Sequence, residues 1–196
     1  MKEGQTFYPL VRALTRKHGT VLIYDEIVTG FRLALGGVQE YFGVPPDLAV
    51  FAKGFANGMP LSVYCGKAEI MEKLDKVIVS STYGGETLSL ASAKAAIHTY
   101  RSRNVIDHLW KMGERLDDGL NALFRKYGLP AEMRGFPPCA AISLAKDAPA
   151  GLSEKFYRAA YRNGVSLYGV PYVNFSHQET DIAETLERLE NGLREL

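Results

Sequence analysis

Two short, unbroken runs of strand-forming residues constrain the fold of this chain more than any other feature of its sequence. The first run spans residues 20–24 and is followed by Asp25, and the second spans residues 47–52 and is followed by Lys53. A continuous apolar run of this length fits a strand that is covered on both faces, as in a parallel sheet. The pattern therefore indicates an α/β fold in which a charged residue follows each of two buried strands.

The rest of the chain divides into amphipathic segments and turn-rich loops. Phe7, Leu10, Val11 and Leu14 follow helical spacing and share one face, which predicts a first helix. Further helices are expected over residues 39–42, 87–101, 104–127, 153–162 and 181–196. Further strands are expected over residues 61–65, 77–81 and 165–168 and within residues 133–145.

Composition excludes several classes of protein. The chain has 196 residues, of which 46% are hydrophobic and 23% are charged, as in an average globular protein. Its formal net charge is +1 with the charges scattered, so neither a nucleic-acid nor a membrane surface is expected. The two cysteines lie far apart and no apolar run is long enough to span a bilayer, so we expect a cytoplasmic protein without a metal site.

Asp25 and Lys53 are the residues most suggestive of chemistry. Ligands of open α/β sheets bind at the carboxyl ends of strands, where both residues are expected. A desolvated lysine amine suits Schiff-base formation with an aldehyde, and a buried carboxylate can keep a pyridine nitrogen protonated. Together they suggest pyridoxal phosphate as the cofactor. From spacing alone the alternative remains open that these are an ordinary cap and a solvated or ion-paired side chain.

Several linked segments resemble a known family. They are residues 22–32, 46–48, 51–54, 57–60 and 81–91, followed near the end of the chain by Phe175, Ser176, His177, Asp181 and Ile182. In this order they resemble the class III aminotransferases, and more narrowly the glutamate-1-semialdehyde 2,1-aminomutase-like branch. Members of the family are commonly about twice as long as this chain, and the resemblance covers only their C-terminal half.

The resemblance implies a fold and a set of site residues. The fold would be the pyridoxal phosphate-dependent transferase fold type I, with residues 1–102 as part of the large cofactor-binding domain and residues 103–196 as the small C-terminal domain. Lys53 would form the Schiff base with the cofactor and then move a proton between the substrate and the cofactor. Asp25 would pair with the pyridine nitrogen.

Two further cofactor contacts are implied by the same resemblance. Ile27 would pack against one face of the cofactor ring, although it is an ordinary core position in any other interpretation. Thr82 would bind the cofactor phosphate across a dimer interface, whereas without the family it would be a turn hydroxyl. We assign no catalytic step to His177.

The function implied is pyridoxal phosphate-dependent transfer of an amino group between a small-molecule donor and a carbonyl acceptor. The substrate would be an amino acid or an amino-aldehyde or keto compound, by transaminase or aminomutase chemistry. The chain would act as a homodimer or with a partner that supplies the missing half. Two alternatives remain open: a non-catalytic fragment or interaction subunit that needs such a partner, and an unrelated α/β binding module.

Overall fold

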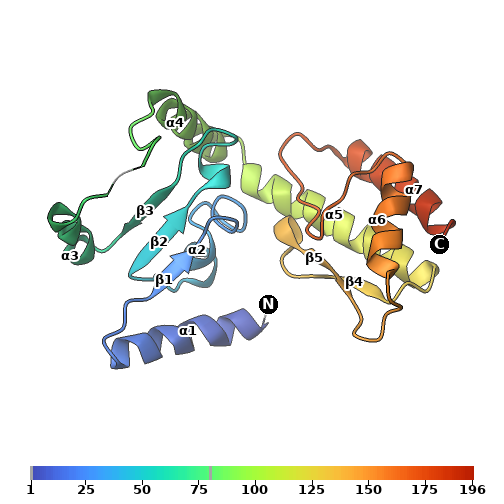
Figure 1. Ribbon diagram of the computed structural model, residues 1–196, viewed down its shortest axis with the longest axis horizontal. Helices are drawn as coiled ribbons and strands as arrows, with labels where there is room; N and C mark the ends of the chain where they lie inside the picture. The colour runs from blue at the N-terminus through green and yellow to red at the C-terminus, as the bar shows by residue number, and fades with distance from the viewer. Residues whose placement is uncertain (1, 80) are drawn as a thin grey trace. The chain divides into compact units, whose positions relative to one another are not determined.

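The computed structural model of the protein describes residues 2–79 and 81–196. The chain divides into two compact units, Met1–Ile106 and Asp107–Leu196, which are described separately below. The helices and strands of both units are labelled in Figure 1. None of the helices within the described residues is both long and apolar enough to cross a membrane.

The first unit is built on a three-stranded sheet of order β1-β2-β3 (Figure 1). Its strands are β1 (Ile23–Asp25), β2 (Leu48–Phe51) and β3 (Val63–Gly66). Strands β1 and β2 are parallel, and β2 and β3 are antiparallel. The parallel pair agrees with the apolar character of the two runs, and it brings the carboxyl ends of β1 and β2 to the same edge of the sheet.

Helices and short 3-10 segments complete the first unit. They are α1 (Lys2–Lys17), α2 (Val38–Phe42), η1 (Lys53–Phe55), α3 (Ala68–Met71), η2 (Glu72–Lys76) and α4 (Thr87–Ser102). The long helix α5 (Val105–Lys126) begins at the end of this unit and belongs mainly to the second.

The first helix faces the sheet with a different side from the one that its sequence suggests. Phe7, Leu10 and Leu14 are 57%, 62% and 59% exposed, whereas Arg12 is buried. The Arg12 guanidinium forms an ion pair with Asp47 at 2.9 Å. The apolar spacing identified a helix correctly but not its buried face, because a buried ion pair holds the opposite side against the sheet.

Asp47 ties three segments of the first unit together. Its carboxylate accepts a hydrogen bond from the Leu22 backbone N–H at 2.8 Å and forms ion pairs with Arg12 at 2.9 Å and Lys67 at 2.8 Å. The hydrogen bond from Leu22, together with the two cations, holds the pKa of Asp47 well below its usual range. This network fixes the start of β2 relative to α1 and β1.

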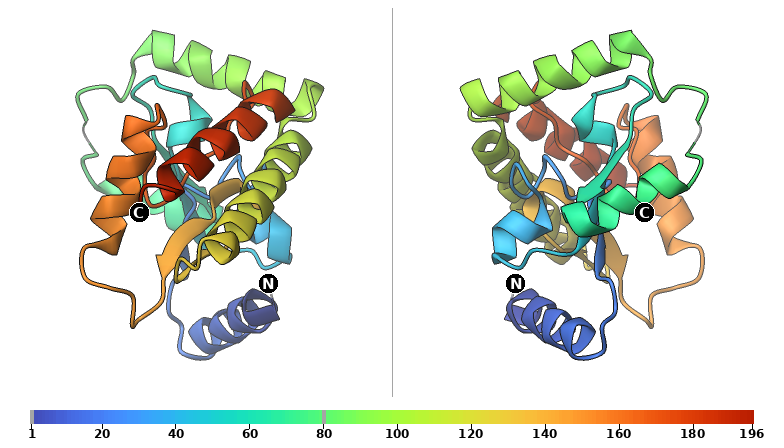
Figure 2. Two further views of the ribbon diagram at one scale, coloured as in Figure 1. Left: turned by 90° about the vertical axis from the view of Figure 1, so that its right-hand side faces the viewer. Right: turned by 90° about the vertical axis from the view of Figure 1, so that its left-hand side faces the viewer.

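The second unit packs helices on one side of a small hairpin. Its elements after α5 are β4 (Ala131–Arg134), η3 (Pro137–Cys139), β5 (Ala141–Leu144), α6 (Leu152–Arg162) and α7 (Glu179–Leu193). Strands β4 and β5 are antiparallel, and α6 and α7 lie side by side (Figure 2). The core includes buried apolar side chains of α5, α6 and α7, among them Leu109, Met112, Leu120, Phe124, Phe156 and Leu189.

Two of the expected strands are absent from the described residues. Residues 77–79 and 81 form no strand, and Ser80 lies outside the described residues. Residues 165–168 also form no strand. Directly after them, the Gly169 carbonyl accepts a hydrogen bond from the Ile142 N–H at 2.7 Å, so this segment approaches β5 without forming a ladder. Both segments have strand-forming side chains, but a strand also requires a neighbouring backbone to pair with.

Candidate functional site

Asp25 and Lys53 lie at the same edge of the sheet. Asp25 is the last residue of β1, and Lys53 follows β2 after one intervening residue and begins η1. Because β1 and β2 are neighbours and run parallel, both residues come at the carboxyl ends of adjacent strands. This is the position at which open α/β sheets bind their ligands.

The Asp25 carboxylate is exposed and is oriented by its own turn. Its Oδ1 accepts a hydrogen bond from the Ile27 backbone N–H at 3.0 Å. Ile27 is half-buried in the turn that follows β1. The expectation of a buried carboxylate is therefore wrong for this chain by itself, since the described residues leave this face of β1 open.

Lys53 is also exposed, in contrast to the desolvated amine expected from the sequence. Its backbone is left-handed, with φ of 47°, and so is that of Asn57, with φ of 46°. The Lys53 carbonyl oxygen accepts hydrogen bonds from the N–H groups of Ala56 at 3.2 Å and Asn57 at 2.9 Å. A non-glycine residue rarely adopts positive φ, so this tight turn needs support from its surroundings.

Helix α4 provides that support. The Tyr100 hydroxyl donates a hydrogen bond to the Gly54 carbonyl oxygen at 3.0 Å, and Ser92 Oγ donates one to the Ala56 carbonyl oxygen at 2.8 Å. The Tyr100 ring stacks on Phe31 with 5.2 Å between the ring centroids. Phe31 in turn contacts Phe55 at 5.9 Å. The turn that carries Lys53 is thus held by hydrogen bonds and by an aromatic cluster.

Glu26 is a structural residue of the site that the sequence analysis did not single out. It is 1% exposed, and its carboxylate accepts hydrogen bonds from Thr29 Oγ1 at 2.5 Å, Val38 N–H at 2.9 Å and Gln39 N–H at 3.0 Å. The Glu26 carbonyl oxygen also accepts one from Gly30 N–H at 2.9 Å. A second acidic residue directly after a buried strand was the available signal. Its function here is to fold the loop that follows Asp25.

Thr82 lies in the turn before α4 and is exposed. Within the described residues it makes no hydrogen bond. The structure therefore brings together Asp25, Ile27 and Lys53 around one edge of the sheet, but gives no direct link between this group and Thr82.

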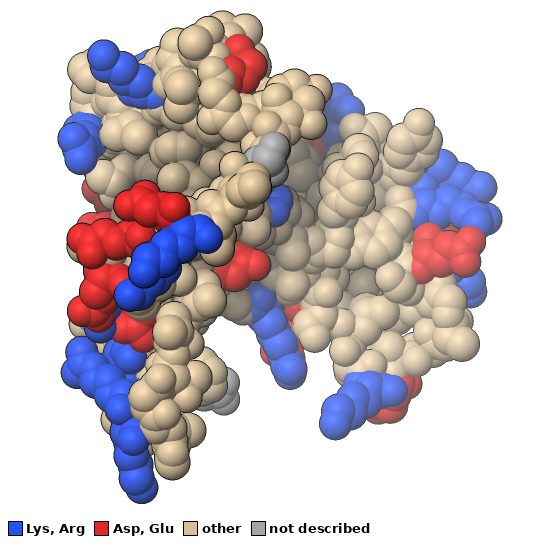
Figure 3. Space-filling model, turned by 60° about the vertical axis from the view of Figure 1, so that its left-hand side comes forward, with Lys and Arg blue, Asp and Glu red and all other residues tan. Residues whose placement is uncertain are grey.

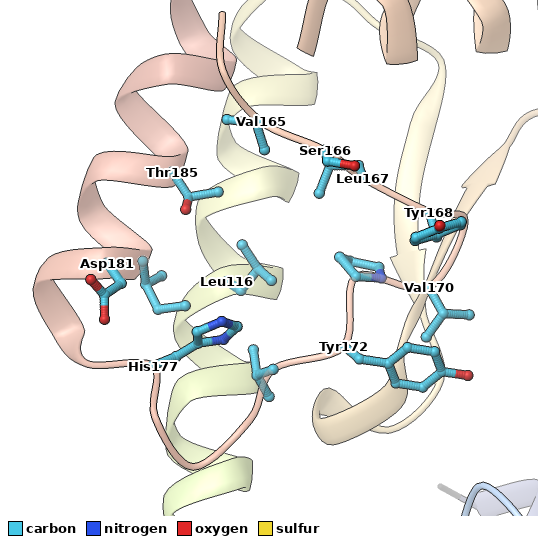
Figure 4. Close-up of a pocket in the computed structure, with 13 residues that line it drawn as sticks. Leu116, Val165, Ser166, Leu167, Tyr168, Val170, Tyr172, His177, Asp181 and Thr185 are labelled. Atoms are coloured by element: carbon cyan, nitrogen blue, oxygen red, sulfur yellow. The ribbon is translucent and has the colours of Figure 1, made fainter. Parts of the chain in front are cut away.

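A separate cavity lies within the second unit (Figure 4). Its volume is about 290 Å³, and its lining is mainly apolar, with Leu116, Val165 and Val170 among the residues. The His177 ring nitrogens interact with Asn174, so this histidine acts in the local turn before α7. This cavity contains none of the predicted site residues.

Charges of both signs share the surface shown in Figure 3, where acidic and basic side chains lie near one another. This agrees with the formal net charge of +1 for the whole chain.

The residues at the sheet edge have the donor set that pyridoxal phosphate requires. A primary amine can attach to its aldehyde, and a carboxylate can hold a proton on its pyridine nitrogen. Lys53 and Asp25 supply these two groups from adjacent strand ends. The exposure of both residues leaves space for a ligand at this edge, so the residues present fit the group.

Comparison with known proteins identifies the family of the chain. The family model described as aminotransferase class-III matches residues 2–191. The glutamate-1-semialdehyde 2,1-aminomutase of Persephonella marina is 31% identical over 98% of this chain and 49% of its own length. The 3-aminobutyryl-CoA aminotransferase of Cloacimonas acidaminovorans is 33% identical over 95% of this chain and 46% of its own length. The chain thus spans about half the length of these curated relatives.

Solved structures share the fold. The FumI protein of Sphingopyxis sp. MTA144, in its pyridoxal phosphate internal aldimine form, superposes with a TM-score of 0.91 at 24% identity, over 97% of this chain and 47% of that one. An omega-transaminase from Sphaerobacter thermophilus gives a TM-score of 0.86 at 21% identity, over 97% of this chain and 48% of that one. These similarities confirm the expected α/β fold, that of the fold type I pyridoxal phosphate-dependent transferases.

Proposed function

Because the chain belongs to the class-III aminotransferase family, we propose that it supplies the catalytic lysine and carboxylate of an enzyme that transfers amino groups with pyridoxal phosphate. The observation that carries this proposal is the placement of Asp25 and Lys53 at the carboxyl ends of two adjacent parallel strands. No other arrangement in the described residues offers an amine and a carboxylate at a ligand-binding edge of a parallel sheet.

When bound, pyridoxal phosphate supplies an aldehyde carbon and a protonated ring that accepts electrons from the substrate. Lys53 would hold the group through its amine, and the same amine, when free, would move a proton to and from the substrate carbon. Asp25 would hold the proton on the ring nitrogen. Ile27, at the start of the turn after β1, would pack against the ring, and Thr82 would bind the phosphate from a second subunit.

Residues 1–102 are proposed as part of the cofactor-binding domain and residues 103–196 as the small domain. The names of two relatives, a glutamate-1-semialdehyde 2,1-aminomutase and a 3-aminobutyryl-CoA aminotransferase, support a proposal for the substrate class. We therefore propose a small-molecule amino donor and a carbonyl acceptor, handled by transaminase or aminomutase chemistry in a homodimer or with a partner chain.

The exposure of Lys53 and Asp25 favours the alternative that the chain needs a partner to complete its site. A Schiff-base lysine works best when its neutral amine is favoured by desolvation, and this chain alone does not desolvate Lys53. The chain is then an interaction subunit or non-catalytic fragment until a partner that supplies the missing half covers the site.

The test is covalent trapping. The chain is mixed with pyridoxal phosphate, reduced with borohydride and mapped by mass spectrometry to find which lysine carries the pyridoxyl group. We expect Lys53 to be labelled in preference to the other lysines, and Lys53→Ala to lose that label while Lys76→Ala, which removes another exposed lysine, keeps it. Labelling spread evenly over the lysines would contradict the proposal for the isolated chain and favour the alternative.

A further inference from the structure

The turn that presents Lys53 depends on a carbonyl group that is shielded from water. Ala56 is 0% exposed, so its carbonyl oxygen must find its hydrogen bonds inside the chain. This oxygen accepts a long hydrogen bond from the Met59 N–H at 3.4 Å and a shorter one from Ser92 Oγ at 2.8 Å. The Ser92 hydroxyl is therefore the better of the two donors at a buried acceptor.

The same turn is left-handed at both ends. Lys53 begins it with φ of 47°, and Asn57 ends it with φ of 46°. The N–H groups of Ala56 and Asn57 close it by donating hydrogen bonds to the Lys53 carbonyl oxygen. A non-glycine residue keeps a positive φ only where surrounding contacts hold it. A contact that fixes Ala56 therefore also fixes the backbone that carries the Lys53 side chain.

Helix α4 holds this turn at two points. Ser92 donates to the Ala56 carbonyl oxygen, and Tyr100 donates to that of Gly54. Ser92 and Tyr100 are separated along the helix axis by about 12 Å, at about 1.5 Å per residue. Helix side chains lean toward the N-terminus, which lets the long tyrosine and the short serine reach carbonyl groups that are close together in the turn.

We propose that Ser92 is a positioning residue for Lys53. Its hydroxyl holds the Ala56 peptide group, which keeps Lys53 left-handed and directs its amine to the ligand-binding edge of the sheet. This role rests on the proposed function, in which that amine holds the cofactor. Ser92 contacts neither cofactor nor substrate in this assignment, and it acts only through the backbone of the turn.

The geometry of one peptide group explains why the hydroxyl matters. The Ala56 carbonyl and the Asn57 N–H belong to the same planar group. Without Ser92 Oγ the buried oxygen keeps only its 3.4 Å bond, so conformations that turn it toward water are favoured. Turning it outward also removes the 2.9 Å hydrogen bond from Asn57 N–H to the Lys53 carbonyl oxygen. Lys53 can then return to negative φ, which redirects its side chain.

The experiment compares Ser92→Ala with two other variants of α4. Ser102→Ala is the matched control, because it removes a hydroxyl that donates to the His98 carbonyl oxygen at 2.8 Å within the helix itself. Ser92→Thr keeps a hydroxyl at the same position and is the rescue variant. Alanine favours a helix more than serine does, so Ser92→Ala should fold, and circular dichroism checks this for all three chains.

Two measurements by NMR need no cofactor. Amide exchange reports the hydrogen bonds from Ala56 and Asn57, and the carbon chemical shifts of Lys53 report its φ. In Ser92→Ala we expect both amides to exchange at least about fivefold faster, since one hydrogen bond is lost, and the Lys53 shifts to move toward negative φ. Borohydride trapping with pyridoxal phosphate should label Lys53 several-fold more slowly. Ser102→Ala should match the unmodified chain, and Ser92→Thr should restore most of the rate.

Three results would overturn this role of Ser92. The first is unchanged amide exchange and unchanged Lys53 shifts in Ser92→Ala. The second is a loosened turn with an unchanged labelling rate, which would make Ser92 a structural residue only. The third is an equal loss of labelling in Ser102→Ala. Absence of any label on Lys53 in the unmodified chain would refute the proposed function alone, because the exchange rates and shifts still decide whether Ser92 holds Lys53 left-handed.

Discussion

Tyr100 on helix α4 donates a hydrogen bond from its hydroxyl to the carbonyl oxygen of Gly54, the residue after Lys53, at 3.0 Å. The two residues are 46 positions apart in the sequence. The bond links a helix late in the first unit to the left-handed turn that presents the Lys53 amine. We therefore expect Tyr100 to be a positioning residue, which acts on the candidate site through the backbone of this turn.

Removing that hydroxyl should loosen the turn without removing the ring. In Tyr100→Phe the stacking on Phe31 remains, while a hydrogen bond of about 1 kcal/mol is lost. We expect several-fold slower pyridoxyl labelling of Lys53 at equal cofactor concentration, measured by quantitative mass spectrometry. In Tyr161→Phe, a change at an exposed position of α6, Lys53 should be labelled at the same rate as in the unmodified chain. Equal rates for both variants would show that the hydrogen bond does not position Lys53.

Asp25→Asn should separate cofactor attachment from proton transfer. The amide cannot hold a proton on the pyridine nitrogen, but Lys53 keeps its amine. We expect Lys53 to be trapped by borohydride as before, while amino-group transfer by the chain complexed with a complementing half falls by about 100-fold or more. Spectroscopic titration of the bound cofactor should show its ring nitrogen losing its proton at lower pH. Unchanged turnover would exclude Asp25 from the ring-nitrogen contact.

Glu26→Gln should destabilise the loop after β1. The buried carboxylate accepts hydrogen bonds from Thr29, Val38 and Gln39, and an amide turns one acceptor oxygen into a donor that faces other donors. We expect a loss of about 2 kcal/mol in the free energy of unfolding, measured by urea denaturation. Glu69→Gln, at an exposed position of α3, is the matched control and should change stability by less than about 0.5 kcal/mol.

Asp47 should make the first unit sensitive to acid. Its hydrogen bond from Leu22 and its ion pairs hold its pKa below that of the unfolded chain, which is about 3.9. The stabilisation is therefore complete above that value and is lost as the pH falls below it. Asp47→Asn should cost about 3 kcal/mol at pH 7, because it leaves the buried Arg12 without its partner. The difference from the unmodified chain should shrink as urea denaturation is repeated toward pH 3, and a constant difference would contradict this account.

Asp117 on α5 should have the opposite effect to Asp47, because it should make the folded chain less stable as the pH rises. Burial, with smaller contributions from the nearby carboxylates of Asp118 and Glu114, raises its pKa to about 7. Because the folded state favours the protonated acid, stability should fall as the pH rises from about 4 through 7. Asp117→Asn should therefore be more stable than the unmodified chain at pH 8 and close to it at pH 4. Asp147→Asn, an exposed loop position, should show no such pH-dependent gain in thermal unfolding.

The sequence by itself determined the class of fold and pointed to the two central residues of the candidate site. Two apolar runs, each followed by a charged residue, are local features of the sequence. Because the two runs form neighbouring parallel strands, Asp25 and Lys53 lie at the same edge of the sheet. The long helix α5 was also predictable, because its apolar stripe repeats over several turns. Linked motifs in a fixed order then indicated the family.

Only the tertiary structure decided which surfaces are covered. Phe7 and Leu10 have the spacing of a buried helix face, yet an ion pair between Arg12 and Asp47 holds the other side of α1 against the sheet. Residues 77–79 have strand-forming side chains but no strand to pair with among the described residues. Burial and pairing depend on what lies opposite a segment in space, and a pattern along the chain cannot specify that neighbour. The same reason explains why Glu26 became a buried anchor while Asp25, one residue earlier, remained exposed.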